Sequence, residues 1–238
     1  MPRPNLLVVR AGDASLHERW LAGARQRSFD LMVSYYGDVP GRFNHGIEYY
    51  HAMKGPRWPA HDALWKHQRA LFESYGHVGF ACDDVDANAD SWNRVFQGCA
   101  WYELDLAQPA VDGHVNWEIT RRVPGSMLRY TSFVEAMCPV FSRRALQRVA
   151  PTFGESISGW GLSFVWSKLL PWPDYRSAII DAVTVTHTTP MRQGTLRPTL
   201  DALGIDPEKE RSEVLARHGI ESFWMGEHAR LRIAKNDE

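Results

Sequence analysis

The chain alternates short apolar runs with stretches of helical periodicity. "NLLVV" (5–9), "DLMVSYY" (30–36) and "AIIDAVTVTH" (178–187) are rich in branched or aromatic residues, and the first two are followed by glycine-containing turns. Such runs are typical of strands buried on both faces. We expect further strands or extended segments at 47–53, 77–82, 101–111 and 128–141.

Helical patterns separate these strands. A helix is predicted after the first strand, where Leu16, Trp20 and Leu21 share one face, and another over 58–73. Shorter helices are expected at 90–96, 143–149 and 159–170. This alternation predicts an α/β fold with a single Rossmann-like, mostly parallel sheet flanked by helices. We expect it over residues 1–197, with a C-terminal helical extension over 198–238 packed on it.

Composition and charge exclude several classes of protein. The 238 residues are 44% hydrophobic, enough for one sizeable core, and 27 Lys and Arg balance 28 Asp and Glu. This balance does not favour nucleic-acid binding. The sequence has no apolar run long enough for a membrane span and no signal-peptide pattern, so a cytoplasmic location is expected. The 3 cysteines form no CxxC pair.

Polar residues gather where the predicted strands end. Gly12 and Asp13 follow the first strand, Asp83 to Asp86 follow "HVGFAC", and His187 ends the last strand. Ligands of open α/β sheets bind beyond the carboxyl ends of the strands. One edge of the sheet could therefore bring all of these residues together.

The aspartates in "FACDDVDANAD" have two interpretations. Alternate residues of an extended chain point the same way, so Asp84 and Asp86 could converge on Mn or Mg. His187 is a candidate third ligand. Alternatively, Asp83 and Asp84 end the strand, while Asp86 and the residues up to Asp90 form a turn and a helix cap.

Other segments carry candidate site residues. Lys54 and Arg57 in "KGPRW" could bind phosphate or could be solvated surface residues. Glu135 lies among apolar neighbours, which suggests a buried acid with a function. The turn Gly159-Trp160-Gly161 would let a ligand approach the backbone beside an aromatic plate.

The order of these motifs resembles a family catalogued as domain of unknown function 707. The segments that carry the resemblance are "FACDDVDANADSW", "FVEAMCPVFSRRAL", "SGWGLSFVW" and "AIIDAVTVTHTTP", and the match covers roughly residues 54–190. That family looks like glycosyltransferases of the A-type fold, which bind a nucleotide sugar through a D-x-D motif and a divalent metal.

The resemblance implies a role for each motif. Asp84 and Asp86 would hold Mn or Mg and the diphosphate, His187 would complete the metal site, and Asp83 would contact the ribose or the sugar. Gly12 and Asp13 would lie near the nucleoside. Glu135 and the Gly159-Trp160-Gly161 turn would face the acceptor and the transferred sugar. The expected function is a metal-dependent, hexosyltransferase-like transfer, in polysaccharide biosynthesis, from a nucleotide-sugar donor to a carbohydrate or glycan acceptor.

One position departs from the family pattern. Ser163 follows Gly-Trp-Gly-Leu where the family usually has Asp, and a hydroxyl does not accept a proton at neutral pH as a carboxylate does. Either Glu135 or Glu155 is the base, or the reaction retains configuration, or the chain binds without turnover. The alternatives to a transferase are therefore a catalytically impaired carbohydrate- or nucleotide-binding protein and a metal-dependent phosphoesterase.

Overall fold

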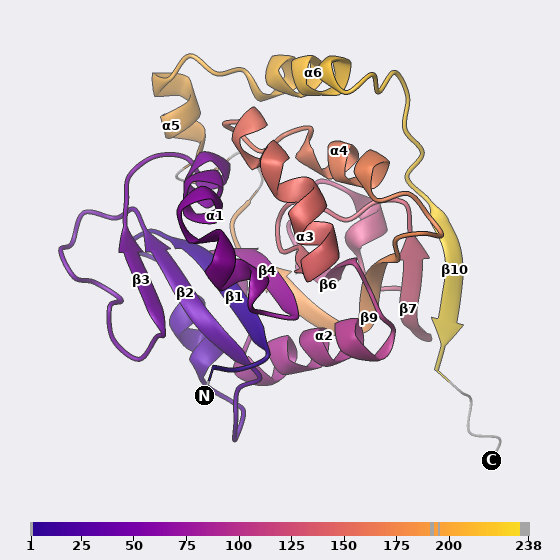
Figure 1. Cartoon of the computed structure of the whole chain (residues 1–238), viewed down its shortest axis with the longest axis horizontal. Helices are drawn as coiled ribbons and strands as arrows, with labels where there is room; N and C mark the ends of the chain where they lie inside the picture. Colours follow the sequence, from indigo (N-terminus) through magenta and orange to yellow (C-terminus); the bar gives the residue numbers. More distant parts are fainter. Residues whose placement is uncertain (1, 191–192, 195, 234–238) are drawn as a thin grey trace.

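The computed structural model describes residues 2–190, 193–194 and 196–233, which form one large mixed sheet with helices on both faces (Figure 1). Its strands are β1 (Asn5–Ala11), β2 (Phe29–Tyr35), β3 (Tyr49–Ala52), β4 (His77–Cys82), β5 (Val85–Asp86), β6 (Leu106–Gly113), β7 (Ser126–Thr131), β8 (Val140–Ser142), β9 (Ser177–His187) and β10 (Glu227–Arg232). The helices are α1 (Arg57–Glu73), α2 (Ala89–Trp101), α3 (Arg143–Val149), α4 (Leu162–Leu169), α5 (Leu196–Ala202) and α6 (Pro207–Arg217). Short 3-10 turns lie at His17–Leu21, Glu118–Thr120 and Ala150–Glu155.

The strand order is β10-β7-β9-β6-β8-β4-β1-β2-β3, and β5 pairs with β9. Strands β3, β2, β1 and β4 are parallel to one another, as are β6 and β9. Strand β8 lies antiparallel between β4 and β6, and β7, β10 and β5 also pair antiparallel. The α/β class is confirmed. Because β8 is antiparallel to both of its neighbours, the carboxyl ends of β1, β4 and β9 lie at the same edge.

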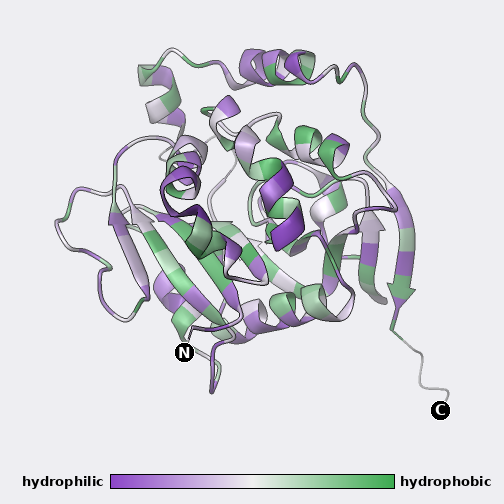
Figure 2. Cartoon of the chain, viewed as in Figure 1, coloured by the Kyte–Doolittle hydropathy of each residue, from purple (hydrophilic) through white to green (hydrophobic). Residues whose placement is uncertain are grey.

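Side-chain alternation along β1 divides the core into two layers. Leu6 and Val8 belong to the cluster that packs against α1, α3 and α4, whereas Leu7 and Val9 belong to the cluster beneath α2. All four side chains are fully buried. In Figure 2 the central strands are largely green, in contrast to the mostly purple α6. The continuous apolar pattern of the first strand therefore reflects burial on both faces.

The helix predicted after the first strand is only one 3-10 turn, His17–Leu21. Ala22 is extended and Gly23 has a positive φ of 93°, so the chain leaves the helical region there. Trp20 is nevertheless buried, and its indole nitrogen donates to the carbonyl oxygen of Val85. The spacing of the apolar residues thus predicted correctly that Trp20 is buried, but the predicted helix was too long.

The sequence suggested a purely helical C-terminal segment, but this segment also contains a strand. After α5 and α6 the chain forms β10, which pairs antiparallel with β7 at the edge of the main sheet (Figure 1). The predicted boundary after residue 197 falls inside α5. Among the described residues, no helix is both long and apolar enough to cross a membrane.

Candidate functional site

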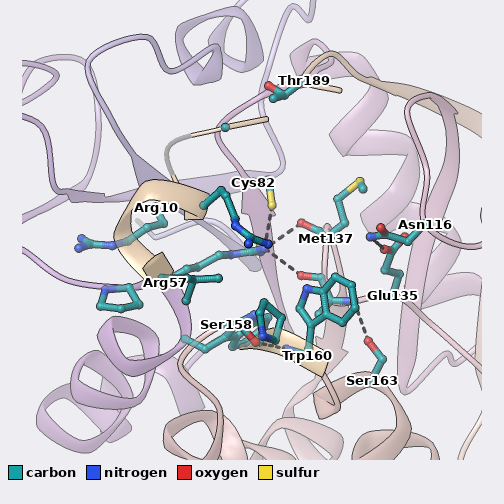
Figure 3. Close-up of a pocket in the computed structure, with 18 of the residues that line it drawn as sticks. Arg10, Arg57, Cys82, Asn116, Glu135, Met137, Ser158, Trp160, Ser163 and Thr189 are labelled. Carbon is teal, nitrogen blue, oxygen red and sulfur yellow. Dashed lines mark hydrogen bonds between the residues drawn. The ribbon is translucent and has the colours of Figure 1, made fainter. Parts of the chain in front are cut away.

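A cavity of about 530 Å³ opens at the edge where β1, β4 and β9 end. Its walls come from these strand ends, from the segment between β7 and β8, from the turn before α4 and from the C-terminal segment of α5 and α6. The volume lies in the range of ligand pockets, roughly 300–1,000 Å³. Figure 3 shows Arg57 reaching into the centre of this region, with Glu135, Ser158 and Trp160 around it.

The cavity brings together eight of the thirteen site residues predicted from the sequence. Those that line it are Arg57, Asp83, Asp84, Glu135, Gly159, Trp160, Gly161 and His187. The residues that do not line it are Gly12, Asp13, Lys54, Asp86 and Glu155.

Asp84 and His187 form a close pair at this edge. His187 Nε2 lies 3.1 Å from Asp84 Oδ2, and His187 Nδ1 lies 2.9 Å from the carbonyl oxygen of His114. Because a carbonyl only accepts, Nδ1 carries the proton, and a neutral His187 presents the lone pair of Nε2 to Asp84. Two acceptors face each other in this way only if a proton or a cation lies between them.

The charges of this pair follow from the same contact. Burial favours the neutral forms, but the mutual hydrogen bond and attraction outweigh it, lowering the pKa of Asp84 and raising the pKa of His187. Oδ1 of Asp84 is buried and makes no hydrogen bond within the described residues. An imidazole nitrogen and a carboxylate with one unused oxygen fit a divalent cation such as Mn.

Asp86 lies apart from this pair. Its Oδ2 accepts a 2.9 Å hydrogen bond from Arg19 in an exposed ion pair. The chain turns at Asp83 and Asp84 before β5 begins, so the alternation rule for an extended chain does not apply across them. Within the described ranges, no group of three His, Cys, Asp or Glu side chains is arranged to hold a metal.

Asp83 is anchored beside the pair. The backbone N–H of Gly12 donates to its Oδ2 at 2.7 Å, and the hydroxyl of Tyr36 lies 3.4 Å from the same oxygen. Burial raises the pKa of Asp83 to about 6, against the effect of the Gly12 hydrogen bond. Gly12 thus acts on the cavity through its backbone.

Asp13 and Lys54 brace the loop that follows β2. Asp13 accepts from the hydroxyl of Tyr35 and from the backbone N–H of Asp38. Lys54 Nζ donates to the carbonyl oxygens of Tyr36 and Gly37 and to the carboxylate of Asp38. Both side chains are therefore already engaged in holding loop structure.

Arg57 connects β4 to the segment that carries Glu135. Its guanidinium donates to the carbonyl oxygens of Phe80, Ala136 and Met137 at 2.9–3.1 Å and to Cys82 Sγ at 2.8 Å. Figure 3 shows Arg57 beside Cys82 and Met137. Because both terminal nitrogens of the guanidinium make these hydrogen bonds, Arg57 contributes fixed positive charge and rigidity to the cavity wall.

Glu135 is 5% exposed and is held from two sides. Asn116 Nδ2 donates to its Oε1 at 2.7 Å, and its backbone N–H donates to the side-chain oxygen of Gln108 at 2.6 Å. Oε2 is buried without a partner in the described part of the chain. Burial raises the pKa of Glu135, as expected for a carboxyl group poised to accept a proton.

Glu155, the other candidate base, points elsewhere. Its Oε2 lies 2.6 Å from Nε2 of His218, at the end of α6. This contact ties the residues before α4 to the C-terminal segment.

The Gly159-Trp160-Gly161 turn is built by close packing. Gly159 has φ of 84°, and a Cβ there would lie 2.4 Å from Cδ1 of Trp58. Gly161 has φ of 96° and packs against Val214 of α6. Both positions therefore require glycine.

Glu210 of α6 holds the same turn from the C-terminal side. Its carboxylate accepts from the backbone N–H groups of Ile157 and Ser158 and from the hydroxyls of Ser156 and Ser158. The guanidinium of Arg211 lies 5.8 Å from the Trp160 ring.

Ser163, which stands where the family that the chain resembles usually has Asp, lines the cavity. Its hydroxyl oxygen accepts a 2.9 Å hydrogen bond from the backbone N–H of Ala136, next to Glu135. It supports the Glu135 segment and supplies no base.

Sequence reasoning missed Arg10, Asn116 and Glu210. Arg10 lines the cavity and donates to the carbonyl oxygens of Met53 and Gly55, while burial lowers its pKa to about 10. An arginine inside an otherwise apolar strand was a usable signal for Arg10. Asn116 and Glu210 stand in polar segments without a distinguishing pattern.

Comparisons with known proteins identify the architecture. No family model matches the chain and no curated protein matches it, so the resemblance to the domain of unknown function 707 gains no support. Solved structures do match. A mannosyltransferase from Pyrobaculum calidifontis in complex with GDP-mannose and Mn²⁺ has a TM-score of 0.53 and 11% identity, covering 94% of this chain and 77% of that one.

Two further structures agree. S. aureus TarS matches with a TM-score of 0.50 and 11% identity over 93% of this chain, and GalNAc-T7 with UDP, GalNAc and Mn²⁺ matches with a TM-score of 0.58 and 8% identity over 90%. The chain spans 44% and 51% of these two proteins, about half of their length. Identities this low establish architecture alone. The protein therefore has the glycosyltransferase A-type fold.

Proposed function

We propose that this protein is a metal-dependent glycosyltransferase that moves a sugar from a nucleotide-sugar donor to a carbohydrate or glycan acceptor. The observation that carries the proposal is the Asp84–His187 pair, which lines a cavity at the carboxyl edge of the sheet. One carboxylate oxygen of Asp84 has no partner among the described residues. Two proteins of the same fold have Mn²⁺ in their structures, one with GDP-mannose and one with UDP and GalNAc.

Asp84 and His187 would hold Mn or Mg, which supplies positive charge where the diphosphate leaves. Two protein ligands suffice for such an ion when substrate phosphates and water complete its coordination. We assign Asp86 no part in this site, since it pairs with Arg19 outside the cavity.

The chain's own residues would orient the donor. Asp83, fixed by Gly12, would accept hydrogen bonds from a ribose or sugar hydroxyl. Arg57 and Arg10 would lend fixed positive charge to the wall that the donor faces. Trp160 would offer an aromatic plate on the acceptor side.

Glu135 is the base that we assign. Its unpartnered Oε2 would take the proton of the acceptor hydroxyl as that oxygen attacks the anomeric carbon and the bond to the nucleotide diphosphate breaks. Glu155 is engaged with His218 and does not line the cavity, so we assign it no role in the reaction.

Calorimetry with UDP-, GDP- and CMP-sugars, with and without Mn, tests the proposal. We expect one nucleotide class to bind only with Mn. Asp84→Asn should abolish this binding, whereas Asp86→Asn should retain it, because Asp86 forms only an exposed ion pair. Absence of binding to every nucleotide by the wild type would exclude the proposal, and equal loss in both variants would exclude the assigned ligands.

Ser163 supports a second candidate function, a carbohydrate- or nucleotide-binding protein without turnover. Its hydroxyl is committed to the backbone of Ala136 and supplies no base. Transfer or hydrolysis of a donor that binds, measured as release of the nucleoside diphosphate, distinguishes the two candidates. Turnover that Glu135→Gln removes would exclude the second.

A further inference from the structure

A second, smaller cavity lies where β7, β9 and β10 meet the segment after α4. Its volume is about 190 Å³, below the usual range for drug-sized ligands and suited to one small ring. It is lined by Thr131, Ser132, Ser167, Leu170, Trp172, Tyr175, Ser177 and His228. Figure 1 shows β7 and β10 at one edge of the sheet. Among the described residues, the cavity shares no lining residue with the cavity at Asp84.

The lining is polar without being charged. The described residues that line it include no Asp, Glu, Lys or Arg, and burial lowers the pKa of His228, which favours its neutral form. A nucleotide or an acidic peptide would meet no compensating charge on these lining side chains. The cavity is therefore suited to a neutral, hydroxyl-bearing molecule.

The hydroxyls of the lining have hydrogen-bonding capacity to spare. Thr131 and Ser167 donate to backbone carbonyls, so their oxygens still have lone pairs to accept from a ligand, whereas Ser132 donates to Trp224 and also accepts from the backbone N–H of Gly226. Ser177 is 7% exposed, and its hydroxyl has no partner within the described residues. A buried hydroxyl without a partner costs stability unless a bound molecule satisfies it.

Trp172, Tyr175 and His228 contribute aromatic rings to the lining, and Trp224 lies next to it. The Trp172 ring is parallel to that of His228, with centroids 5.1 Å apart, and Trp224 meets His228 edge-on at 5.0 Å. Trp172 and Trp224 are 39% and 58% exposed. An amphipathic aromatic next to hydroxyl groups matches a sugar, which has apolar C–H faces and a rim of hydroxyls.

We propose that this cavity is a second carbohydrate-binding site, which takes a neutral saccharide at Trp172, Ser177 and His228. Ser167 donates to the carbonyl oxygen of Ser163, one helical turn away on α4, and Ser163 lines the larger cavity. The two sites therefore lie along one face of α4. If the proposed transferase function holds, an extended glycan acceptor could occupy both.

The test measures binding and needs no activity. The protein, with indole nitrogens labelled, is titrated by NMR with mannose, glucose, galactose, N-acetylglucosamine, N-acetylgalactosamine and their short oligomers. We expect the Trp172 indole signal, assigned with Trp172→Ala, to shift with at least one of these sugars. Because Trp172→Ala removes this signal, the affinities of the variants for the same sugar are measured by calorimetry. Trp172→Ala should weaken that binding about tenfold and Ser177→Ala about fivefold.

Matched controls separate this site from the rest of the molecule. Trp101→Ala removes a tryptophan that is 70% exposed on α2 and should leave the affinity unchanged. Asp84→Asn should also leave it unchanged, so failure of the transferase proposal does not affect this result. No shift of the Trp172 signal with any sugar, or binding that is lost in Asp84→Asn and kept in Trp172→Ala, would overturn the inference.

Discussion

The side chain of Asn116 donates a 2.7 Å hydrogen bond to Oε1 of Glu135 and so orients the carboxylate, whose other oxygen has no partner among the described residues. The two residues come from different parts of the chain, Asn116 from the loop after β6 and Glu135 from the segment between β7 and β8. Burial raises the pKa of Glu135, which suits a group that gains a proton during the reaction.

Glu135→Gln should lower the rate of sugar transfer about 100-fold or more and leave donor binding intact, because the amide keeps the shape and loses the basicity. Asn116→Ala should lower kcat about tenfold, since the carboxylate loses its orientation while keeping its charge. Steady-state kinetics beside calorimetry of donor binding checks both. A Glu135→Gln variant with normal kcat would remove Glu135 as the base.

Gly159→Ala should destabilise the protein by about 2–4 kcal/mol, because the new Cβ meets the Trp58 ring and the backbone lies in the left-handed region. Gly46→Ala provides the matched control. It has a φ of 71° with nothing within 4 Å of the added Cβ, and should cost only about 1 kcal/mol. Urea denaturation of both variants measures the difference, and equal costs would show that Trp58 does not constrain the turn.

Glu210→Ala should disorder the turn that carries Trp160, because it removes the acceptor for four hydrogen bonds. We expect the KM for the acceptor to rise about tenfold with donor affinity unchanged. Glu213→Ala, an exposed position on the same helix, should leave both values as they are. A rise in donor Kd equal to the rise in acceptor KM would indicate that α6 supports the whole cavity.

Acid should destabilise the protein through His61. This side chain is fully buried, both ring nitrogens lack partners in the described residues, and burial holds its pKa well below 6.5. Below that ordinary value the unfolded chain binds a proton that the folded chain excludes, so stability falls by up to about 1.4 kcal/mol per pH unit. His17, with its pKa lowered to about 4 by burial, adds to the effect.

Unfolding measured from pH 7 to pH 5 checks this expectation. His61→Phe should reduce the dependence of stability on pH, because Phe fills the same aromatic surroundings without titrating. His67→Phe, at an exposed position of the same helix, should leave the dependence of stability on pH unchanged. An unchanged slope in His61→Phe would contradict the assignment.

Local pattern predicted most of the elements and the residues at the strand ends. Asp83, Asp84 and His187 were placed at one edge correctly, because parallel strands present their carboxyl ends together. The convergence of Asp84 with Asp86 depended on an extended backbone, and the turn at Asp83 and Asp84 removes that condition. The spacing of the aspartates in the sequence does not predict this turn, because the turn depends on contacts with other parts of the chain.

The C-terminal segment shows most clearly what the local sequence pattern does not predict. Its charged periodicity predicted a helix, and α6 is one, but nothing in the pattern indicated that Glu210 holds the turn of Trp160 or that β10 extends the sheet. These contacts join residues about 50 to 100 positions apart in the sequence.

The α/β class, the buried strands and the acids at their ends could be predicted from the sequence alone, because these follow from the local periodicity of apolar residues. Which of those acids share a cavity depends on the tertiary structure. Asp84 faces His187 while Asp86 faces Arg19, and Glu135 depends on Asn116. Such pairings depend on the order of the strands and the packing of the helices, which bring together residues that are far apart in the sequence.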